Sequence, residues 1–312
     1  MAACHFTEKM ENMLVSGDYY GLPTCSISNT HLRLEFLAKA GPRLVRLFLG
    51  ESRENQLAEA PNFSMDTPYG VYHFYGGHRL WHGPEAFPRS YIPDDSGLTV
   101  EELADGVRLT QPAEAPTGIA KSIDVYLDPS RAALKLVHTL RNDGLWAVEL
   151  TPWGITQLPL GGLAVLPMPG NPPKQSALLP DRNLALWHFT HWTDPRLSFQ
   201  DDYLLIQAQP LMPPCKIGFL SRAGWIGYLR QGVFFRKSFE PEPQATHTDL
   251  SCNVEIFCND ELIELETLAP LRRLEPGSTV SQTEWWEFTT GVDVPMTLEG
   301  VRSLANTLNL SQ

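Results

Sequence analysis

Short runs of alternating apolar and polar residues, each ended by Gly, Pro, Asn or Asp, recur along this chain and restrict its fold more than any other feature. Side chains of a β-strand point alternately to opposite faces, so a period of two is typical of strands with one buried face. The turn residues between the runs favour hairpins. The runs occupy residues 24–41, 43–50, 106–112, 122–129, 133–144, 254–260 and 261–270. We therefore predict an all-β fold of two large, mostly antiparallel sheets.

Helical patterns are few. The candidates are residues 54–60, residues 100–106 unless these form a strand, and residues 297–310, where apolar residues recur at helical spacing. We expect helix in less than about a fifth of the chain, compared with roughly a third in an average globular protein. Strand patterns continue on both sides of the proline-rich residues 163–183, which we interpret as a long surface loop. The prediction is a single domain over residues 1–312.

Charge and cysteine usage restrict the partners and the compartment. The chain has 24 Lys and Arg against 36 Asp and Glu, a net charge of -12, which disfavours nucleic acid and anionic membrane surfaces. Residues 1–13 are too polar for a signal peptide, and no stretch of 18 apolar residues occurs. The five cysteines have no C-x-x-C spacing, so we interpret them as reduced thiols. These features favour the cytosol, and nothing in them sets the oligomeric state.

The densest polar and aromatic segment is YGGHRLWHGPE, residues 75–85. Its Gly-Gly pair permits a backbone turn that other residues disfavour. If the following run is extended, His78 and His82 share one side while Arg79 and Trp81 share the other. One interpretation is a loop whose imidazoles are hydrogen-bonded internally.

Two further interpretations of this segment involve a ligand. A metal site would use His73, His78, His82 and Glu85, which are suitable ligand types for zinc, iron or nickel. Their spacing matches no metal motif, so we predict neither a metal ion nor another cofactor. A sugar pocket would use polar groups to bind hydroxyls and a Trp face to cover the pyranose ring. That interpretation accounts for every unusual residue of the segment.

A second polar segment lies at residues 253–288. Along its strand-like run, Ile263 and Leu265 face one way while Glu264 and Glu266 face the other. On a partly buried face, like charge and desolvation would raise the pKa of one of these carboxyl groups and make it a usable base.

Four segments together resemble the galactose-mutarotase-like superfamily of aldose 1-epimerases. They are AGPRLVRLFLGE (residues 40–51), GGHRLWHGPE (76–85), residues 216–239 and residues 247–278, in the order in which the superfamily has them. The resemblance implies a β-supersandwich whose concave sheet binds a hexose. It also implies a glutamate base on the anomeric hydroxyl, matched here by Glu266, and a histidine acid on the ring oxygen.

The chain departs from that pattern at the acid. The segment that supplies the family's histidine corresponds to ELTPWGITQL, residues 149–158, and has Trp153-Gly154 at that place. Either His78 or His82 supplies the proton instead, or the site binds a sugar without this chemistry. The remaining candidates for sugar contacts are Arg79, Trp81, Glu85, Trp153, Lys237, Asp249, Asn253 and Glu264.

Two functions lead from these observations. The first is carbohydrate binding with aldose 1-epimerase chemistry, and the second is sugar binding or sensing without catalysis; a metal-dependent enzyme and a structural role are weaker alternatives. The aromatic and histidine residues of segment 187–192 line the mouth of a pocket or belong to the core. We expect His78, Arg79 and Glu266 to converge on one cavity.

Overall fold

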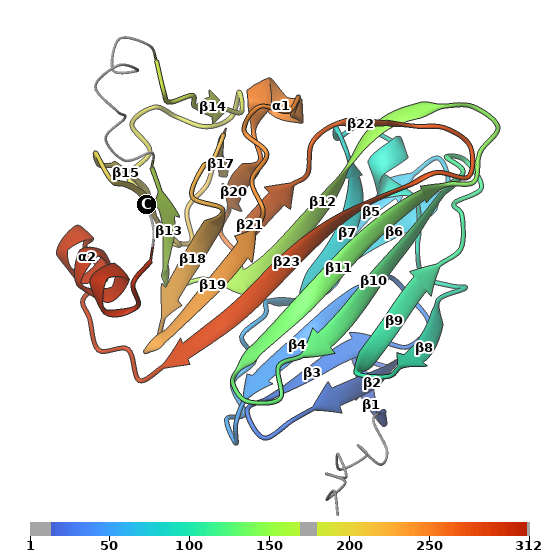
Figure 1. Cartoon of the computed structure of the whole chain (residues 1–312), viewed down its shortest axis with the longest axis horizontal. Helices are drawn as coiled ribbons and strands as arrows, with labels where there is room; N and C mark the ends of the chain where they lie inside the picture. Colours follow the sequence, from blue (N-terminus) through green and yellow to red (C-terminus); the bar gives the residue numbers. More distant parts are fainter. Residues whose placement is uncertain (1–13, 169–179, 311–312) are drawn as a thin grey trace, which may run out of the picture.

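The computed structural model describes residues 14–168 and 180–310 and contains two large sheets that pack face to face (Figure 1). About 52% of the chain is strand and about 6% is helix, as the alternating pattern predicts. The eleven-stranded sheet runs in the order β1 (Val15–Tyr19), β2 (Leu22–Ser28), β3 (Leu32–Leu37), β4 (Arg43–Leu49), β7 (His78–Gly83), β12 (Val148–Pro159), β21 (Leu262–Leu268), β20 (Val254–Cys258), β17 (Cys215–Phe219) and β14 (Ala185–Leu186), with β22 (Arg272–Leu274) beside β12.

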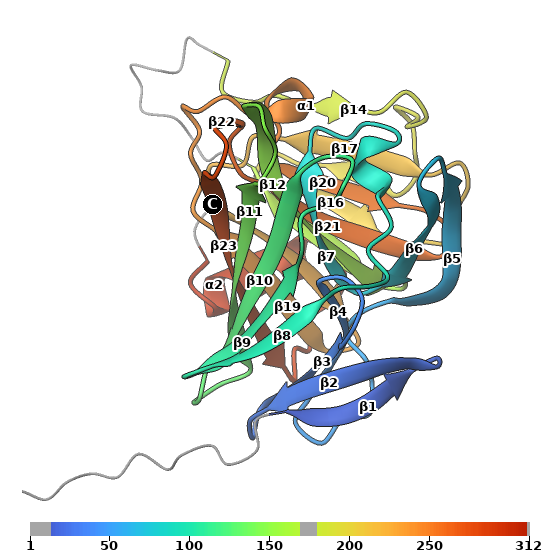
Figure 2. The same ribbon diagram turned by 90° about the vertical axis from the view of Figure 1, so that its right-hand side faces the viewer.

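The second sheet has ten strands and covers one face of the first. It runs in the order β15 (Leu197–Phe199), β16 (Tyr203–Gln207), β13 (Leu163–Pro167), β18 (Trp225–Arg230), β19 (Val233–Phe239), β23 (Thr279–Thr290), β11 (Ala133–Asn142), β10 (Ile119–Leu127), β9 (Gly106–Gln111) and β8 (Thr99–Leu103). A separate hairpin of β5 (Glu59–Thr67) and β6 (Gly70–Gly76) projects beside the first sheet (Figure 2).

Inward-facing apolar side chains of both sheets form the main core. Leu80 and Leu265 of the first sheet meet Leu136 and Trp286 of the second in one buried cluster. Burying such side chains is the main favourable term in folding. The alternation in the sequence therefore reports which side of each strand faces the other sheet.

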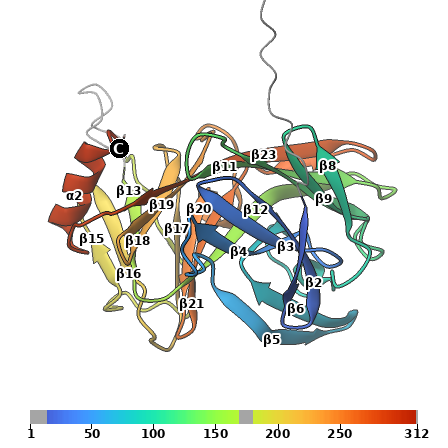
Figure 3. The ribbon, with the colours of Figure 1, turned by 90° about the horizontal axis from the view of Figure 1, so that it is seen from below.

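Helix is confined to three short elements in the described residues. They are η1 (Arg89–Tyr91), α1 (Thr248–Ser251) and α2 (Leu298–Thr307). The hydroxyl of Thr297 accepts a hydrogen bond from the Gly300 amide (3.3 Å) at the start of α2, which packs on the outer face of the second sheet near β13 and β18 (Figure 3). The predicted C-terminal helix is thus confirmed.

Two local predictions need correction, and one open alternative is decided in favour of a strand. Residues 54–60 are not helical: the Asn55 carboxamide accepts from the amides of Leu47 and Leu57 and fixes a loop, and β5 begins at Glu59. Residues 100–106 form β8 and its turn, because pairing with β9 outweighs their weak helical pattern. The predicted loop 163–183 begins with strand β13, whereas its residues 169–179 lie outside the described residues.

The Gly76-Gly77 turn positions the strand that begins at His78. Both glycines have positive φ angles, 85° and 69°. A Cβ on Gly77 would lie 1.9 Å from the carbonyl oxygen of Leu44, so any larger residue would push β4 and β7 apart. The Gly-Gly pair is therefore needed for the close approach of β4 and β7. The side chains that follow it point alternately to the two faces of β7.

Candidate active site

The outer face of β7, β12 and β21, turned away from the second sheet, carries five of the predicted site residues: Arg79, Trp81, Trp153, Glu264 and Glu266. Arg79 lies opposite Ile155, which lies opposite Glu266; Trp81 likewise lies opposite Trp153. Directly opposed residues of antiparallel strands share a face. The prediction that Glu264 and Glu266 project from one face is confirmed by this register.

A cavity of about 260 Å³ opens on this face, a volume near the lower end for small-molecule sites. We call it the aromatic cavity. Its aromatic walls are Phe63, Phe74, Trp81, Tyr91, Trp153, Trp187, Phe189 and Phe257, and its polar side chains are Arg79, Glu85, Gln157, Lys216, Asn259, Glu261 and Glu264. Broad aromatic faces combined with few polar groups favour a ligand that has both apolar faces and hydroxyls.

Arg79, Glu264 and Gln157 form the first polar group of the cavity. Arg79 Nη2 and Gln157 Nε2 both donate to Glu264 Oε1, at 3.1 and 2.7 Å, and the guanidinium lies over the Trp81 ring at 4.5 Å. Arg79 Nε and Nη1 and Gln157 Oε1 are buried and have no protein partner. Unpaired buried polar atoms cost free energy, so these three are well suited to bind a ligand's hydroxyls.

Lys216, Glu255 and Glu266 form the second polar group, which we call the floor cluster. Lys216 Nζ lies 2.8 Å from Glu255 Oε2 and 2.9 Å from Glu266 Oε2. Trp153 Nε1 also donates to Glu266 Oε2 at 2.9 Å. Glu266 is fully buried beneath Trp153, whereas Lys216 lines the cavity between the rings of Trp153 and Trp187.

The floor cluster has two carboxylates for one ammonium group. Burial is the main cause that raises the pKa of both Glu255 and Glu266, while Lys216 opposes the rise. Burial alone would lower the pKa of Lys216, but the attraction of the two carboxylates outweighs it and raises that pKa. Sequence reasoning missed Lys216 and Glu255, although charged residues inside the apolar runs CKIGF and VEIFC were a detectable signal.

His78, His82 and Lys237 lie on the opposite side of the sheet. The prediction that His78, Arg79 and Glu266 converge on one cavity is wrong: Arg79 lines the aromatic cavity and Glu266 is buried on the same face of the sheet, but His78 points to the opposite face because it neighbours Arg79 in β7. His78 Nδ1 lies 2.9 Å from Thr156 Oγ1, and its Nε2 lies 2.7 Å from His138 Nε2. His82 Nε2 lies 3.2 Å from the Glu114 carboxylate, also away from the aromatic cavity.

Lys237 belongs to the same sealed space as His78, where it pairs with Glu284 at 3.1 Å. Its ammonium also donates to the carbonyls of Gly154 (2.9 Å) and Leu265 (3.1 Å), which lie in β12 and β21. Lys237 therefore holds β12 and β21 together from the face opposite the aromatic cavity. We call Lys237, Glu284, His78 and His138 the inter-sheet cluster.

The remaining candidates divide between the cavity and its surroundings. Glu85 lines the aromatic cavity and accepts a hydrogen bond from Tyr91. Asp249 lines an adjoining hollow that also includes Glu85, Trp153 and Trp187. Asn253 lies outside both, and its side chain pairs with the backbone of Ser221 at 2.6 and 2.9 Å.

One group of metal-ligand types lies close together in the described part of the chain. The ligand atoms of His78, His138 and Glu284 are within 4.8 Å of one another. This is a different set from the alternative of His73, His78, His82 and Glu85. The Lys237 ammonium already pairs with Glu284, and its charge opposes a second cation in the same space.

No protein-family model matches this sequence, and no curated protein matches it. Solved structures do resemble it in three dimensions. A putative aldose 1-epimerase from Klebsiella pneumoniae aligns with a TM-score of 0.60 and 9% identity over 95% of this chain and 85% of that one. A putative mutarotase from Salmonella typhimurium aligns with a TM-score of 0.56 and 12% identity over 91% and 96% of the two chains.

A third similar structure is a TPR-domain containing protein from Parabacteroides distasonis, with a TM-score of 0.60 and 14% identity over 88% of this chain. The chain spans 48% of that protein. These similarities show the fold that the sequence segments predicted, which is the galactose-mutarotase-like β-sandwich. None of the helices in residues 14–168 and 180–310 has the length and hydrophobicity that a bilayer crossing requires.

Proposed function

We propose that this chain is a carbohydrate-binding protein that holds a sugar in the aromatic cavity. The supporting observation is the pairing of aromatic walls with three unpartnered buried atoms, Nε and Nη1 of Arg79 and Oε1 of Gln157. A pyranose offers apolar faces to the rings and oxygen and hydroxyl groups to both donors and acceptor. The free thiols of the four described cysteines support a cytosolic location.

A thermal-shift panel of hexoses, pentoses, sugar phosphates and uronates tests this proposal. A specific sugar at a hundred times its Kd should raise the free energy of unfolding by about 2.7 kcal/mol. Trp187→Ala removes a cavity wall and should weaken binding of that sugar about tenfold. Trp146→Ala, a change at an 80% exposed tryptophan elsewhere, is the matched control and should leave the affinity unchanged. Stabilisation by none of the sugars would contradict the proposal.

Aldose 1-epimerisation is the second candidate, and the Glu264 carboxylate that lines the cavity favours it. Ring opening needs a base to take the O1 proton and an acid to protonate O5; C1–C2 rotation and reclosure then exchange the anomers. Glu264 is the choice for the base that lines the cavity, whereas the resemblance assigns that role to Glu266, which is fully buried. Lys216 Nζ lies 4.8 Å from the ring of Trp153, which takes the missing histidine's place, but the raised pKa of Lys216 makes it a poor proton donor at neutral pH. We therefore rank binding first.

Polarimetry of freshly dissolved α-anomers separates the two candidates. For an epimerase, either Glu264→Gln or Glu266→Gln should reduce the acceleration by roughly 10²–10⁴-fold while binding survives, and the variant that does so identifies the base. If the parent binds a reducing sugar and leaves its mutarotation at the buffer rate, the epimerase candidate is rejected and the binding proposal stands.

A further inference from the structure

A second cavity, of about 250 Å³, shares no lining residue with the aromatic cavity. It lies where β19 separates from β23. The two strands pair from Val233 opposite Thr290 to Phe239 opposite Glu284, after which Pro241 and Pro243 lead the chain away. Strand β23 continues to Thr279 with β11 on its other side, which leaves a notch beside Gln282. We call this space the notch cavity.

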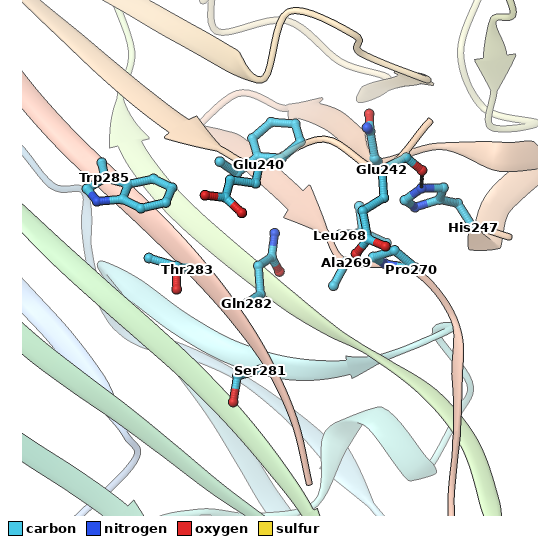
Figure 4. A pocket seen from close by; sticks show the side chains of 12 residues that line it. Glu240, Glu242, His247, Leu268, Ala269, Pro270, Ser281, Gln282, Thr283 and Trp285 are labelled. Atoms are coloured by element: carbon cyan, nitrogen blue, oxygen red, sulfur yellow. Dashed lines mark hydrogen bonds between the residues drawn. The ribbon is translucent and has the colours of Figure 1, made fainter. Parts of the chain in front are cut away.

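Gln282 is the central polar group of the notch cavity. Its side chain points into the space between Glu240 and Ala269 (Figure 4). The residue is only 8% exposed, yet neither its carboxamide nitrogen nor its oxygen has a hydrogen-bond partner in the protein. Leaving such a group unpaired is costly, so a molecule that enters the cavity and pairs with this carboxamide would gain binding free energy.

His247 adds an acceptor to the same cavity. Its Nε2 lies 3.0 Å from the backbone carbonyl oxygen of Glu242. A carbonyl can only accept, so Nε2 carries the hydrogen and Nδ1 of the neutral ring is an acceptor. The residue is 7% exposed, and Nδ1 has no partner in the protein.

The charges and rings of the notch cavity favour a cation. Glu240 and Glu242 both line it, and of these Glu242 is paired with Arg272 at 2.6 Å on the surface. Phe239 and Trp285 supply aromatic walls that attract cations by their ring quadrupoles. Two buried acceptors without a protein partner, Gln282 Oε1 and His247 Nδ1, can pair with a group that donates, and the exposed Glu240 adds a negative charge at the rim.

We propose that the notch cavity binds a small organic ammonium ion. A primary ammonium group donates N–H bonds to acceptors of this kind and is attracted by the Glu240 charge, and its alkyl part can lie against the rings of Phe239 and Trp285. The volume corresponds to roughly eight water molecules, which limits the ligand to a small amine. This site is independent of the proposed sugar site.

Calorimetric titration of the whole protein with n-butylammonium chloride at fixed ionic strength tests the proposal, with n-butanol as the neutral analogue of equal length. We expect the ammonium to bind and n-butanol not to compete. Glu240→Gln removes the unpaired charge, and Gln282→Leu replaces the amide by an apolar side chain of similar length; each should weaken binding about tenfold. Glu275→Gln, a surface carboxylate paired with Arg273, is the matched control and should change nothing.

Three results would overturn the proposal. One is the absence of binding heat for n-butylammonium, and another is equally tight binding of n-butanol. The third is an affinity that neither Glu240→Gln nor Gln282→Leu lowers, since the ammonium would then bind elsewhere. Circular dichroism and the melting temperature of each variant establish that it is folded, and replacing an unpaired buried amide by Leu is expected to preserve stability.

Discussion

The two faces of the central strands carry two buried lysine clusters with opposite charge balance. In the floor cluster, Lys216 meets two carboxylates and lines a cavity. In the inter-sheet cluster, Lys237 pairs with one carboxylate, that of Glu284, which lies close to two histidines, and Lys237 is completely enclosed. The backbone between them is shared, because Lys237 donates to carbonyls of β12 and β21.

The pKa directions follow from this difference. In the floor cluster burial raises the pKa of Glu255 and Glu266, and two carboxylates together raise that of Lys216. In the inter-sheet cluster burial lowers the pKa of Lys237, and the nearby cations hold the pKa of Glu284 below its usual range despite burial. The carboxylates of the floor cluster therefore take up protons readily, whereas the inter-sheet cluster keeps the Glu284 carboxylate ionised.

Lys237→Met should have the largest effect, because it leaves the fully buried Glu284 carboxylate without its ammonium partner. Removing one member of a buried ion pair typically costs 3–5 kcal/mol of unfolding free energy. Chemical denaturation measures this loss. Adding Glu284→Gln should recover part of it, since the unpaired charge is then gone; a loss below about 1 kcal/mol for the single variant would show that Glu284 is neutral in the folded protein.

Lys216→Met should cost less, about 1–3 kcal/mol, although it strands two carboxylates. Both groups already have raised pKa values and can become neutral by binding protons, and the adjacent cavity admits water. The same denaturation experiment compares the two lysines directly. Equal losses for the two variants would mean that the neighbouring cavity does not lower the cost of the stranded carboxylates in the floor cluster. The proposed difference between the two clusters would then be wrong.

Sequence reasoning predicted the sheets and the division of side chains on single strands, but not which face of β7 holds the site. Alternation showed that His78 and Arg79 diverge, and a period of two cannot say which of them meets the second sheet. The resemblance to mutarotases favoured a histidine acid, and this led to the wrong face. Asn253, Asp249 and Lys237 were chosen by proximity in the sequence, which does not determine direction.

Lys216 and Glu255 form a cluster that could not be predicted from either sequence segment alone. Each lies in an apolar strand and looks like an isolated charge, and their meaning appears only when β17, β20 and β21 align. Glu255 lies directly opposite Glu266, a pairing that depends on the register of two strands. Such cross-strand contacts depend on the strand register, which the hydrophobic pattern and the turn geometry set together, so no single segment reveals them.

The smallest predicted effect concerns the pH dependence of stability, which the floor cluster should dominate near neutrality. A carboxyl group whose pKa is raised on folding binds more protons in the folded than in the unfolded state, so stability falls as pH rises from the ordinary glutamate pKa through the raised value. Glu255→Gln removes one such group and relieves its repulsion of Glu266, and it should flatten this fall. Thermal unfolding across pH 4 to 8, about the range between the ordinary glutamate pKa and neutrality, measures the slope. The exposed Glu275→Gln is the control, and an unchanged slope in Glu255→Gln would show that Glu255 holds no proton that the unfolded chain releases.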